Sequence, residues 1–211
     1  MPQILLTGFR GSGKTAIGRR VAQRLQADFT DLDETILALC PTDARWRPTC
    51  SELFYSIGAC AFIDLQRRAA RRITDETVPE ERNALVVAGA EALVDFQTQM
   101  ILAPLGASIF IHRDFEEIWR DLALQGLPSH LRVRGGKQDW LQLLHEREPV
   151  CIRHARCVID ATGRDTEQTA RLVLEAIEKD KKRGPSVRGS VIAAVASPQP
   201  TPCPAVSERL G

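Results

Sequence analysis

Short apolar runs alternate with longer amphipathic segments along most of the chain. Five segments of four or five residues fit buried strands of a parallel sheet; four of them are mainly apolar, and residues 27–31 (ADFTD) are the more polar candidate. We predict strands over Gln3–Thr7, Ala27–Asp31, Leu85–Ala88, Ser108–His112 and Cys157–Asp160. In the longer segments apolar residues recur every three or four positions, which is typical of helices with one buried face. We predict helices over Lys14–Leu25, Ala59–Ile73, Phe115–Leu124, Trp140–Arg147 and Thr166–Lys179.

This order of strands and helices predicts the fold class. Strands separated by helices favour βαβ units, in which parallel strands share one sheet and helices cover both of its faces. We therefore expect an α/β protein of three layers, with a five-stranded parallel sheet flanked by helices. Ligands of such sheets bind at the carboxyl ends of the strands. The residues that follow the predicted strands are thus the first candidates for a functional site.

The last 31 residues differ in composition from the rest. They hold five of the twelve prolines and a net charge of +4, whereas the preceding residues carry −3. A Pro/Ser/Ala-rich segment without periodicity cannot bury enough apolar surface to offset its ordering entropy. We predict a folded domain over residues 1–180 and a disordered basic tail over residues 181–211. A binding arm is the alternative for this tail.

Overall composition excludes several functions. Lys and Arg number 28 and Asp and Glu 27, which argues against a nucleic-acid binder held by bulk charge. No apolar run approaches the roughly 20 residues of a membrane helix, and no basic segment precedes the first strand as in a secretory signal. The six cysteines form no CxxC pair. They are typical of reduced thiols in a cytoplasmic protein with no membrane partner.

The strongest chemical signal follows the first strand. Residues 8–15, GFRGSGKT, fit the P-loop pattern G-x-x-x-x-G-K-[ST], between a buried strand and an amphipathic helix. Lys14 would place a cation at the β- and γ-phosphates, and Thr15 would offer a hydroxyl to Mg²⁺. A plain glycine-rich turn does not explain this Lys-Thr pair. We expect ATP phosphates to bind the backbone and side chains of Gly11, Ser12, Gly13, Lys14, Thr15 and Ala16.

Two carboxylates, Asp31 and Asp33, end the second predicted strand. Alternation along an extended segment would put both on one side, beside the P-loop. There they are suited to Mg²⁺ and to an acceptor hydroxyl. The alternative is that one of them caps the helix that begins near Glu34. The position of the pair, sixteen residues after Thr15, favours the functional interpretation.

These motifs together resemble the shikimate kinase family of small P-loop kinases. The resemblance begins with the first strand, the GxxGxGKT loop, residues 17–22 (IGRRVA) and the DxD pair, and it continues in register to about Ile177. It implies a P-loop kinase fold and a transfer of the ATP γ-phosphate to the 3-hydroxyl of shikimate, in aromatic amino acid biosynthesis. It also implies ATP and Mg²⁺ as cofactors, a small hydroxy acid as substrate and a monomeric protein.

The resemblance also implies roles for single residues. Asp31 joins Thr15 at Mg²⁺, Asp33 contacts the acceptor hydroxyls as the candidate base, and Arg120 packs on adenine. Arg147, in the family's R-x-P-x-Y pattern, binds the substrate carboxylate, although Cys151 stands where the tyrosine should be. Four further matches complete the set: Phe54 and Phe62 as aromatic walls of the acceptor pocket, Gly89 at its strand end, and Arg132 as the catalytic lid arginine.

The departures from the family fall on the acceptor side. Where the family has F-R-x-x-E, this chain has Ile63 in place of the arginine and Gln66 in place of the glutamate. Where the family has A-T-G-G-G, this chain keeps one glycine, Gly89. The lid lacks R-P-x-L. Arg132 is the best match, and a second alignment offers Leu127-Pro128 with no arginine.

Losing one buried guanidinium–carboxylate pair weakens binding by about 10- to 100-fold. The sequence thus indicates intact ATP handling and altered acceptor recognition. Besides a shikimate kinase, two hypotheses remain: a kinase for another small polyol or acid, and a catalytically weak nucleotide-binding protein.

Overall fold

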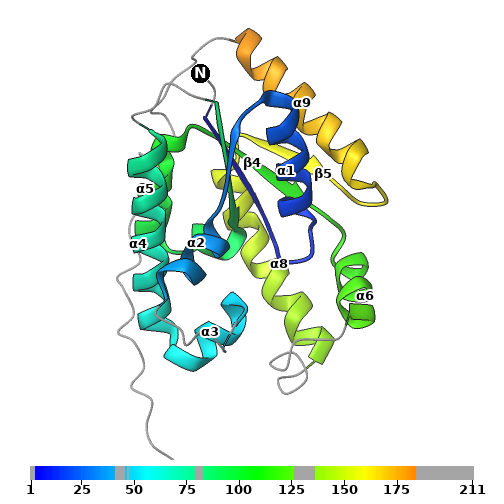
Figure 1. The fold of residues 1–211 in the computed structure, drawn as a ribbon. Coiled ribbons are helices and arrows are strands. Elements are labelled where there is room, and N and C mark those ends of the chain that lie inside the picture. The colour runs from blue at the N-terminus through cyan, green and yellow to red at the C-terminus, as the bar shows by residue number, and fades with distance from the viewer. Residues whose placement is uncertain (1–2, 41–45, 47, 79–82, 126–135, 184–211) are drawn as a thin grey trace, which may run out of the picture.

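The predicted parallel sheet is confirmed. The computed structural model describes residues 3–40, 46, 48–78, 83–125 and 136–183. Their five strands form one parallel sheet in the order β2-β3-β1-β4-β5 (Figure 1). The strands are β1 (Gln3–Gly8), β2 (Asp28–Asp31), β3 (Ala84–Gly89), β4 (Ala107–His112) and β5 (Cys157–Asp160).

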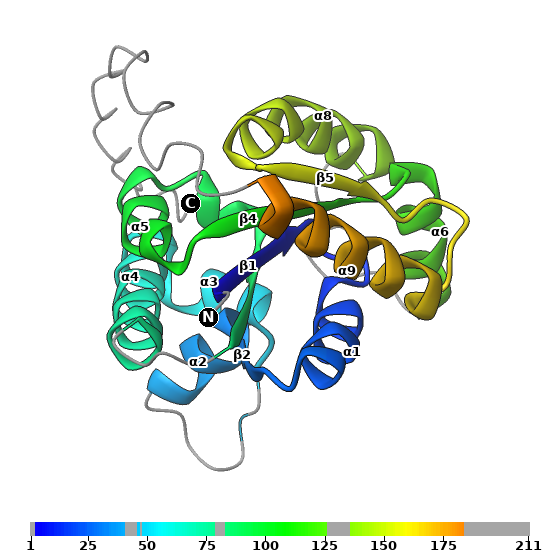
Figure 2. The same cartoon turned by 90° about the horizontal axis from the view of Figure 1, so that it is seen from above.

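Helices cover both faces of the sheet, as the three-layer prediction requires (Figure 2). One face carries α1 (Lys14–Leu25) and α9 (Thr166–Arg183). The other face carries α2 (Leu32–Leu39), α3 (Cys50–Ile57), α4 (Ala59–Thr77), α5 (Phe96–Leu102), α6 (Phe115–Gln125) and α8 (Gly136–His154). Two short 3₁₀ turns, η1 (Ala90–Leu93) and η2 (Ala103–Leu105), follow β3 and α5. No helix within the described ranges is long and apolar enough to cross a bilayer.

Alternation along the strands divides the core. In β1, Ile4 and Leu6 point toward α1 and α9, whereas Leu5 between them packs on the α4 and α5 side. Side chains of successive strand residues face opposite sides, so a continuously apolar strand fills two cores at once. A third apolar cluster, around Phe9 and Phe110, lies between the P-loop side of the sheet, α6 and α8. The phosphate loop is therefore anchored in packed side chains from its first residues.

Helices α8 and α9, like α4, continue further than predicted. Helix α8 runs past Arg147 to His154 with Pro149 inside it, because the continuation buries Cys151 and sacrifices only one backbone hydrogen bond at an exposed position. Helix α9 ends at Arg183, three residues into the segment predicted as tail. The rest of that segment, residues 184–211, lies outside the described residues.

An ion pair joins α4 to α5 beside the core. The Arg67 guanidinium donates from Nε and Nη2 to the two carboxylate oxygens of Asp95, at 2.9 and 2.7 Å. Asp95 also caps α5, accepting from the Thr98 backbone N–H at 2.9 Å. The hydrogen bonds from Arg67 lower the pKa of the Asp95 carboxyl to about 2. This pair therefore contributes stability at every pH at which Asp95 is ionised.

We expect Asp95→Ala to lower the free energy of unfolding at pH 7 by about 2 kcal/mol. The folded-state pKa lies below the unfolded value, so this contribution is present above the ordinary aspartate range and is lost as pH falls toward about 2. Urea titrations at pH 7 and pH 3 measure the difference. Asp64→Ala is the matched control: this 75% exposed carboxylate lies 3.6 Å from the same arginine and contributes about 0.5 kcal/mol or less. Equal effects of the two changes would contradict the assignment.

Candidate active site

The P-loop joins β1 to α1 at the carboxyl edge of the sheet. Gly11 and Gly13 have φ angles of +86° and +81°, where a side chain would be strained, and Gly13 is the N-cap of α1. Lys14 is the first helical residue and is only 9% exposed. The Oγ atom of Ser12 is buried and has no hydrogen-bond partner among the described residues. The P-loop and the N-terminus of α1 thus bring together backbone amides, the Ser12 hydroxyl and the Lys14 ammonium, which form a candidate phosphate cradle.

The acidic pair lies beside this cradle, but not as an extended segment. Strand β2 ends at Asp31, and Asp33 lies in the first turn of α2. Asp31 caps that helix, because its Oδ1 accepts from the backbone N–H of Asp33 at 2.9 Å. Its Oδ2 accepts from the Thr15 hydroxyl at 3.0 Å. The alternation argument was therefore wrong about how the carboxylates come together, while the capping alternative is correct for Asp31.

Charge converges on Asp33. Burial raises the pKa of its carboxyl above the ordinary value, and the Lys14 ammonium opposes that rise. The negative charges of Asp31 and Glu91 raise the pKa of Asp33 further, and Arg10 lowers it. The carboxyl group of Asp33 is therefore influenced by charged side chains from the P-loop, from β2 and from η1.

The two aromatic residues predicted to wall the acceptor pocket contact each other. The rings of Phe54, in α3, and Phe62, in α4, meet edge to face with centroids 5.5 Å apart. Ile63 follows on α4 and is only partly exposed. Arg10, which sequence reasoning left without a role, extends from the P-loop and donates to the Ser51 hydroxyl of α3 at 2.7 Å. The only signal for Arg10 was its position inside the P-loop motif.

Gly89 lies at the carboxyl end of β3, on the far side of the same region. Gly89 ends β3 and pairs with Gly8 of the P-loop strand. A Cβ atom on Gly89 would lie 3.0 Å from Oε2 of Glu91, so the Glu91 side chain folds back over this strand end. The thiol of Cys151 contacts the Ala90 carbonyl at 3.6 Å and holds α8 against η1. Cys151, at the tyrosine position of the family pattern, thus has a packing role.

An interaction at the end of β4 fixes the part of α8 that carries Arg147. His112 Nδ1 lies 2.5 Å from Oε1 of Glu148. Arg113, the next residue, donates to the Gly11 carbonyl at 3.2 Å and pairs with Asp121 at 2.7 Å. Sequence reasoning missed this role of Arg113, whose only signal was a charged residue just after a buried strand.

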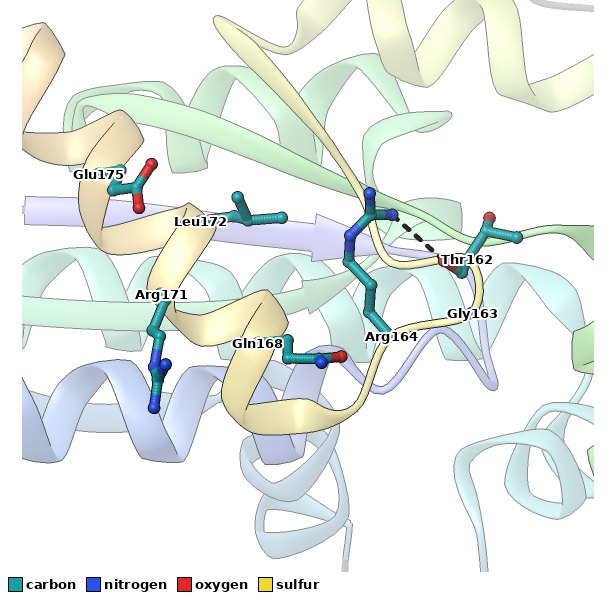
Figure 3. A pocket seen from close by; sticks show the side chains of 7 residues that line it. All are labelled: Thr162, Gly163, Arg164, Gln168, Arg171, Leu172 and Glu175. Atoms are coloured by element: carbon teal, nitrogen blue, oxygen red, sulfur yellow. Dashed lines mark hydrogen bonds between the residues drawn. The ribbon is translucent and has the colours of Figure 1, made fainter.

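The candidate nucleotide residues line two separate hollows. Arg120 lines one of about 370 Å³ with Trp119 and Lys137. Thr162, in the loop that follows β5, lines another of about 540 Å³ along α9 (Figure 3). The loop is held at its base by the Asp114 N–H, which donates to the Thr162 hydroxyl at 3.0 Å. Arg120 and Thr162 therefore flank the P-loop side without sharing one cavity.

The structure brings most predicted residues to one edge of the sheet. The P-loop residues 11–16, Asp31, Asp33, Gly89 and Phe62 all come from elements that meet at the carboxyl ends of β1, β2 and β3. Arg147 lies in α8, and its place at the acceptor site stays a prediction. Arg132 and the alternative Leu127-Pro128 lie outside the described residues, so the lid position stays a prediction.

Fold and site together define a P-loop kinase that acts on a small molecule. Residues 10–178 match the model of the shikimate kinase family. The chain belongs to the shikimate kinase family, and the resemblance inferred from its motifs is confirmed. Shikimate kinase from Francisella philomiragia is 29% identical over 160 residues, which cover 76% of this chain and 85% of that relative. Shikimate kinase from Streptomyces coelicolor is 29% identical over 177 residues, covering 84% and 96%.

Solved structures agree on the fold. Shikimate kinase from Bacteroides thetaiotaomicron superposes with a TM-score of 0.68 at 24% identity, covering 84% of this chain and 98% of its own. Shikimate kinase from Acinetobacter baumannii, solved in complex with shikimate, gives 0.70 at 22% identity and covers 86% and 95%. A gluconokinase from Sinorhizobium meliloti gives 0.57 at 17% identity, covering 86% and 94%. The predicted P-loop kinase fold is therefore confirmed.

Proposed function

We propose that this protein transfers the γ-phosphoryl group of ATP to the 3-hydroxyl of shikimate. The observation that carries the proposal is that the Lys14 ammonium of the P-loop acts on the buried carboxyl group of Asp33 and opposes the rise in its pKa. A phosphate-binding cation there faces a carboxylate that can orient an acceptor hydroxyl. Family membership and the shikimate kinases among its relatives supply the acceptor.

The residues present fit ATP and Mg²⁺. The positive φ angles of the loop glycines open the backbone toward phosphate oxygens, and the Ser12 hydroxyl, which has no partner in the described part of the chain, has a donor to offer. Thr15 and Asp31, already in contact, would hold Mg²⁺ through oxygen atoms, the ligands that this ion prefers. When bound, Mg²⁺ neutralises charge on the phosphates. The remaining positions of such an ion are usually filled by water and substrate phosphates.

In this proposal the chain's own groups supply alignment and charge. Lys14 and the loop amides hold the β- and γ-phosphates, and Asp33 orients the acceptor hydroxyl and accepts its proton. Arg147 binds the acceptor carboxylate, Phe62 and Gly89 bound the pocket, and Arg120 packs on adenine. The lid arginine is Arg132. Transfer then requires little covalent chemistry from the protein, because positioning and electrostatic stabilisation lower the barrier.

A coupled ADP-release assay tests the proposal. With Mg²⁺-ATP, we expect millimolar shikimate to stimulate ADP release well above the rate without acceptor. ATP binding, seen as a thermal shift, without shikimate-dependent release would contradict the assignment of the acceptor. That result would favour the nucleotide-binding hypothesis or another acceptor.

We also propose that the protein acts as a monomer in the cytoplasm. The monomer is what the family resemblance implies, and the location follows from the scattered cysteines. Light scattering at micromolar concentration tests the oligomeric state.

A further inference from the structure

We propose that Arg113 is a positioning residue for the nucleotide: together with Glu117 it fixes the P-loop relative to the loop that follows β5, and so sets the affinity for ATP and ADP. This inference rests on the proposed function only in so far as the P-loop binds a nucleotide, and it does not depend on the acceptor. Neither residue belongs to the motifs that carry the family resemblance.

The sheet places Arg113 between the two loops. Strand β4 lies between β1, which leads into the P-loop, and β5. Arg113 follows the last residue of β4, at the edge of the sheet where the carboxyl ends of the strands meet. Its side chain is only 23% exposed, so the guanidinium is held among neighbouring groups. These neighbours lie on both sides of β4.

On the P-loop side, Arg113 holds one peptide group. Its Nη1 donates to the Gly11 carbonyl at 3.2 Å. The N–H of the same peptide group, which belongs to Ser12, donates to the Phe9 carbonyl at 3.1 Å. Because a peptide group is planar and rigid, hydrogen bonds at both of its ends fix its orientation. The group lies just before Lys14, so its orientation determines how the loop enters the phosphate cradle.

On the other side, Arg113 is linked to the loop after β5 through one carboxylate oxygen. Its Nε donates to Oε2 of Glu117 at 3.2 Å, and the backbone N–H of Gly163 donates to the same oxygen at 3.2 Å. Gly163 lies beside Thr162 at the turn after β5 and lines the hollow of about 540 Å³ along α9 (Figure 3). The Glu117 carboxylate therefore connects Arg113 to the wall of this hollow.

The carboxylates around Arg113 favour a positioning role over direct contact with phosphate. Asp121, one turn after Glu117 on α6, lies 2.7 Å from Nη1 of Arg113. The guanidinium is thus compensated by two carboxylates, which leaves it little net charge to attract a phosphate group. Its planar set of donors, bound on several sides, is suited to hold a fixed place. Its effect on the nucleotide is therefore indirect and acts through the P-loop and Gly163.

Breaking this connection should weaken nucleotide binding and leave the transfer step nearly unchanged. We expect Arg113→Met to raise the Kd for Mg²⁺-ADP and the KM for ATP about tenfold, because the nucleotide must then order the P-loop by itself. A change that weakens binding equally in the ground state and in the transition state raises KM and not kcat. At saturating ATP, kcat should therefore stay close to the wild-type value.

Arg72→Met is the matched control. Arg72 pairs with Glu76 at 2.9 Å, four positions along the helix, as Arg113 pairs with Glu117, but it does so on the exposed face of α4. The control removes the same kind of pair and should leave the Kd for ADP unchanged. Isothermal titration calorimetry measures this Kd without any acceptor.

A double-mutant cycle tests whether the two residues act as one connection. Glu117→Gln keeps the size of the side chain and an oxygen that accepts from Gly163, but it removes the charge that faces Arg113. We expect Glu117→Gln to weaken ADP binding in the wild type and to add little in the Arg113→Met background. Glu117→Gln is also the milder change, and it decides the question if Arg113→Met does not fold.

The outcomes separate this inference from the proposed function. An unchanged Kd for ADP in the folded variants would overturn the inference and leave the proposed function intact. Additive effects in the cycle, or a fall in kcat as large as the rise in KM, would also overturn it. Wild-type protein that binds ADP without phosphorylating shikimate would contradict only the proposed acceptor, and the Kd values alone would then decide. Wild-type protein that binds no ADP would overturn both.

Discussion

Lys14→Met is expected to reduce kcat by about 10³-fold or more. The ammonium of Lys14 is nearly buried at the start of α1, where it stands beside the phosphate cradle. In such a site a fixed cation stabilises the charge that develops on the transferring phosphoryl group far better than water does. Steady-state kinetics with saturating ATP and shikimate measure the effect.

Methionine keeps most of the volume and removes only the charge, so the variant should remain folded. Arg24→Met, at the exposed end of the same helix, is the control and should retain wild-type kcat. A Lys14→Met enzyme within tenfold of the wild type would show that the P-loop cation does not act on the reacting phosphate.

Asp33→Asn is expected to lower kcat by about 10²- to 10³-fold while leaving ATP binding nearly unchanged. The amide keeps the shape of the carboxyl group but cannot take the proton of the acceptor hydroxyl. Because burial raises the pKa of Asp33, its ionised form also costs stability at neutral pH. The variant should therefore be at least as stable as the wild type at pH 7, which excludes misfolding as the cause of lost activity.

The sign of this pKa shift also sets the pH profile. Asp33 must be ionised to act, so activity falls as pH drops through a pKa that lies above the ordinary aspartate value. The acid limb of kcat/KM should lie above that value in the wild type and be absent from the residual activity of Asp33→Asn. An acid limb that persists unchanged in the variant would assign it to another group.

Much of the fold could be predicted because each part has a local signal. Four of the five strands are short, mainly apolar runs, and the P-loop is a contiguous motif whose glycines and lysine are visible in the sequence. The helical periodicity predicted an end of helix α8 at Arg147, whereas the burial of Cys151 that accompanies its continuation is a tertiary effect that the local pattern does not contain.

The acceptor side was less predictable for the same reason. The sequence favoured Asp31 and Asp33 on one extended face over a helix cap, and the structure shows that Asp31 caps α2. Arg10 reaches Ser51 across 41 positions of sequence, and Arg113 reaches Gly11 across 102. In the sequence, Glu91 is only a departure from the family's glycine-rich pattern. The structure shows that its side chain lies beside Gly89 and that its charge acts on Asp33.

The central claim is that wild-type protein phosphorylates shikimate at its 3-hydroxyl. The most direct measurement is to incubate it with Mg²⁺-ATP and shikimate and to identify the product by ³¹P–¹H NMR correlation, with Lys14→Met in parallel. The account predicts a phosphomonoester coupled to the proton on carbon 3, formed by the wild type and not by the variant. ADP formation without a phosphorylated acceptor, or equal product from both proteins, would contradict it.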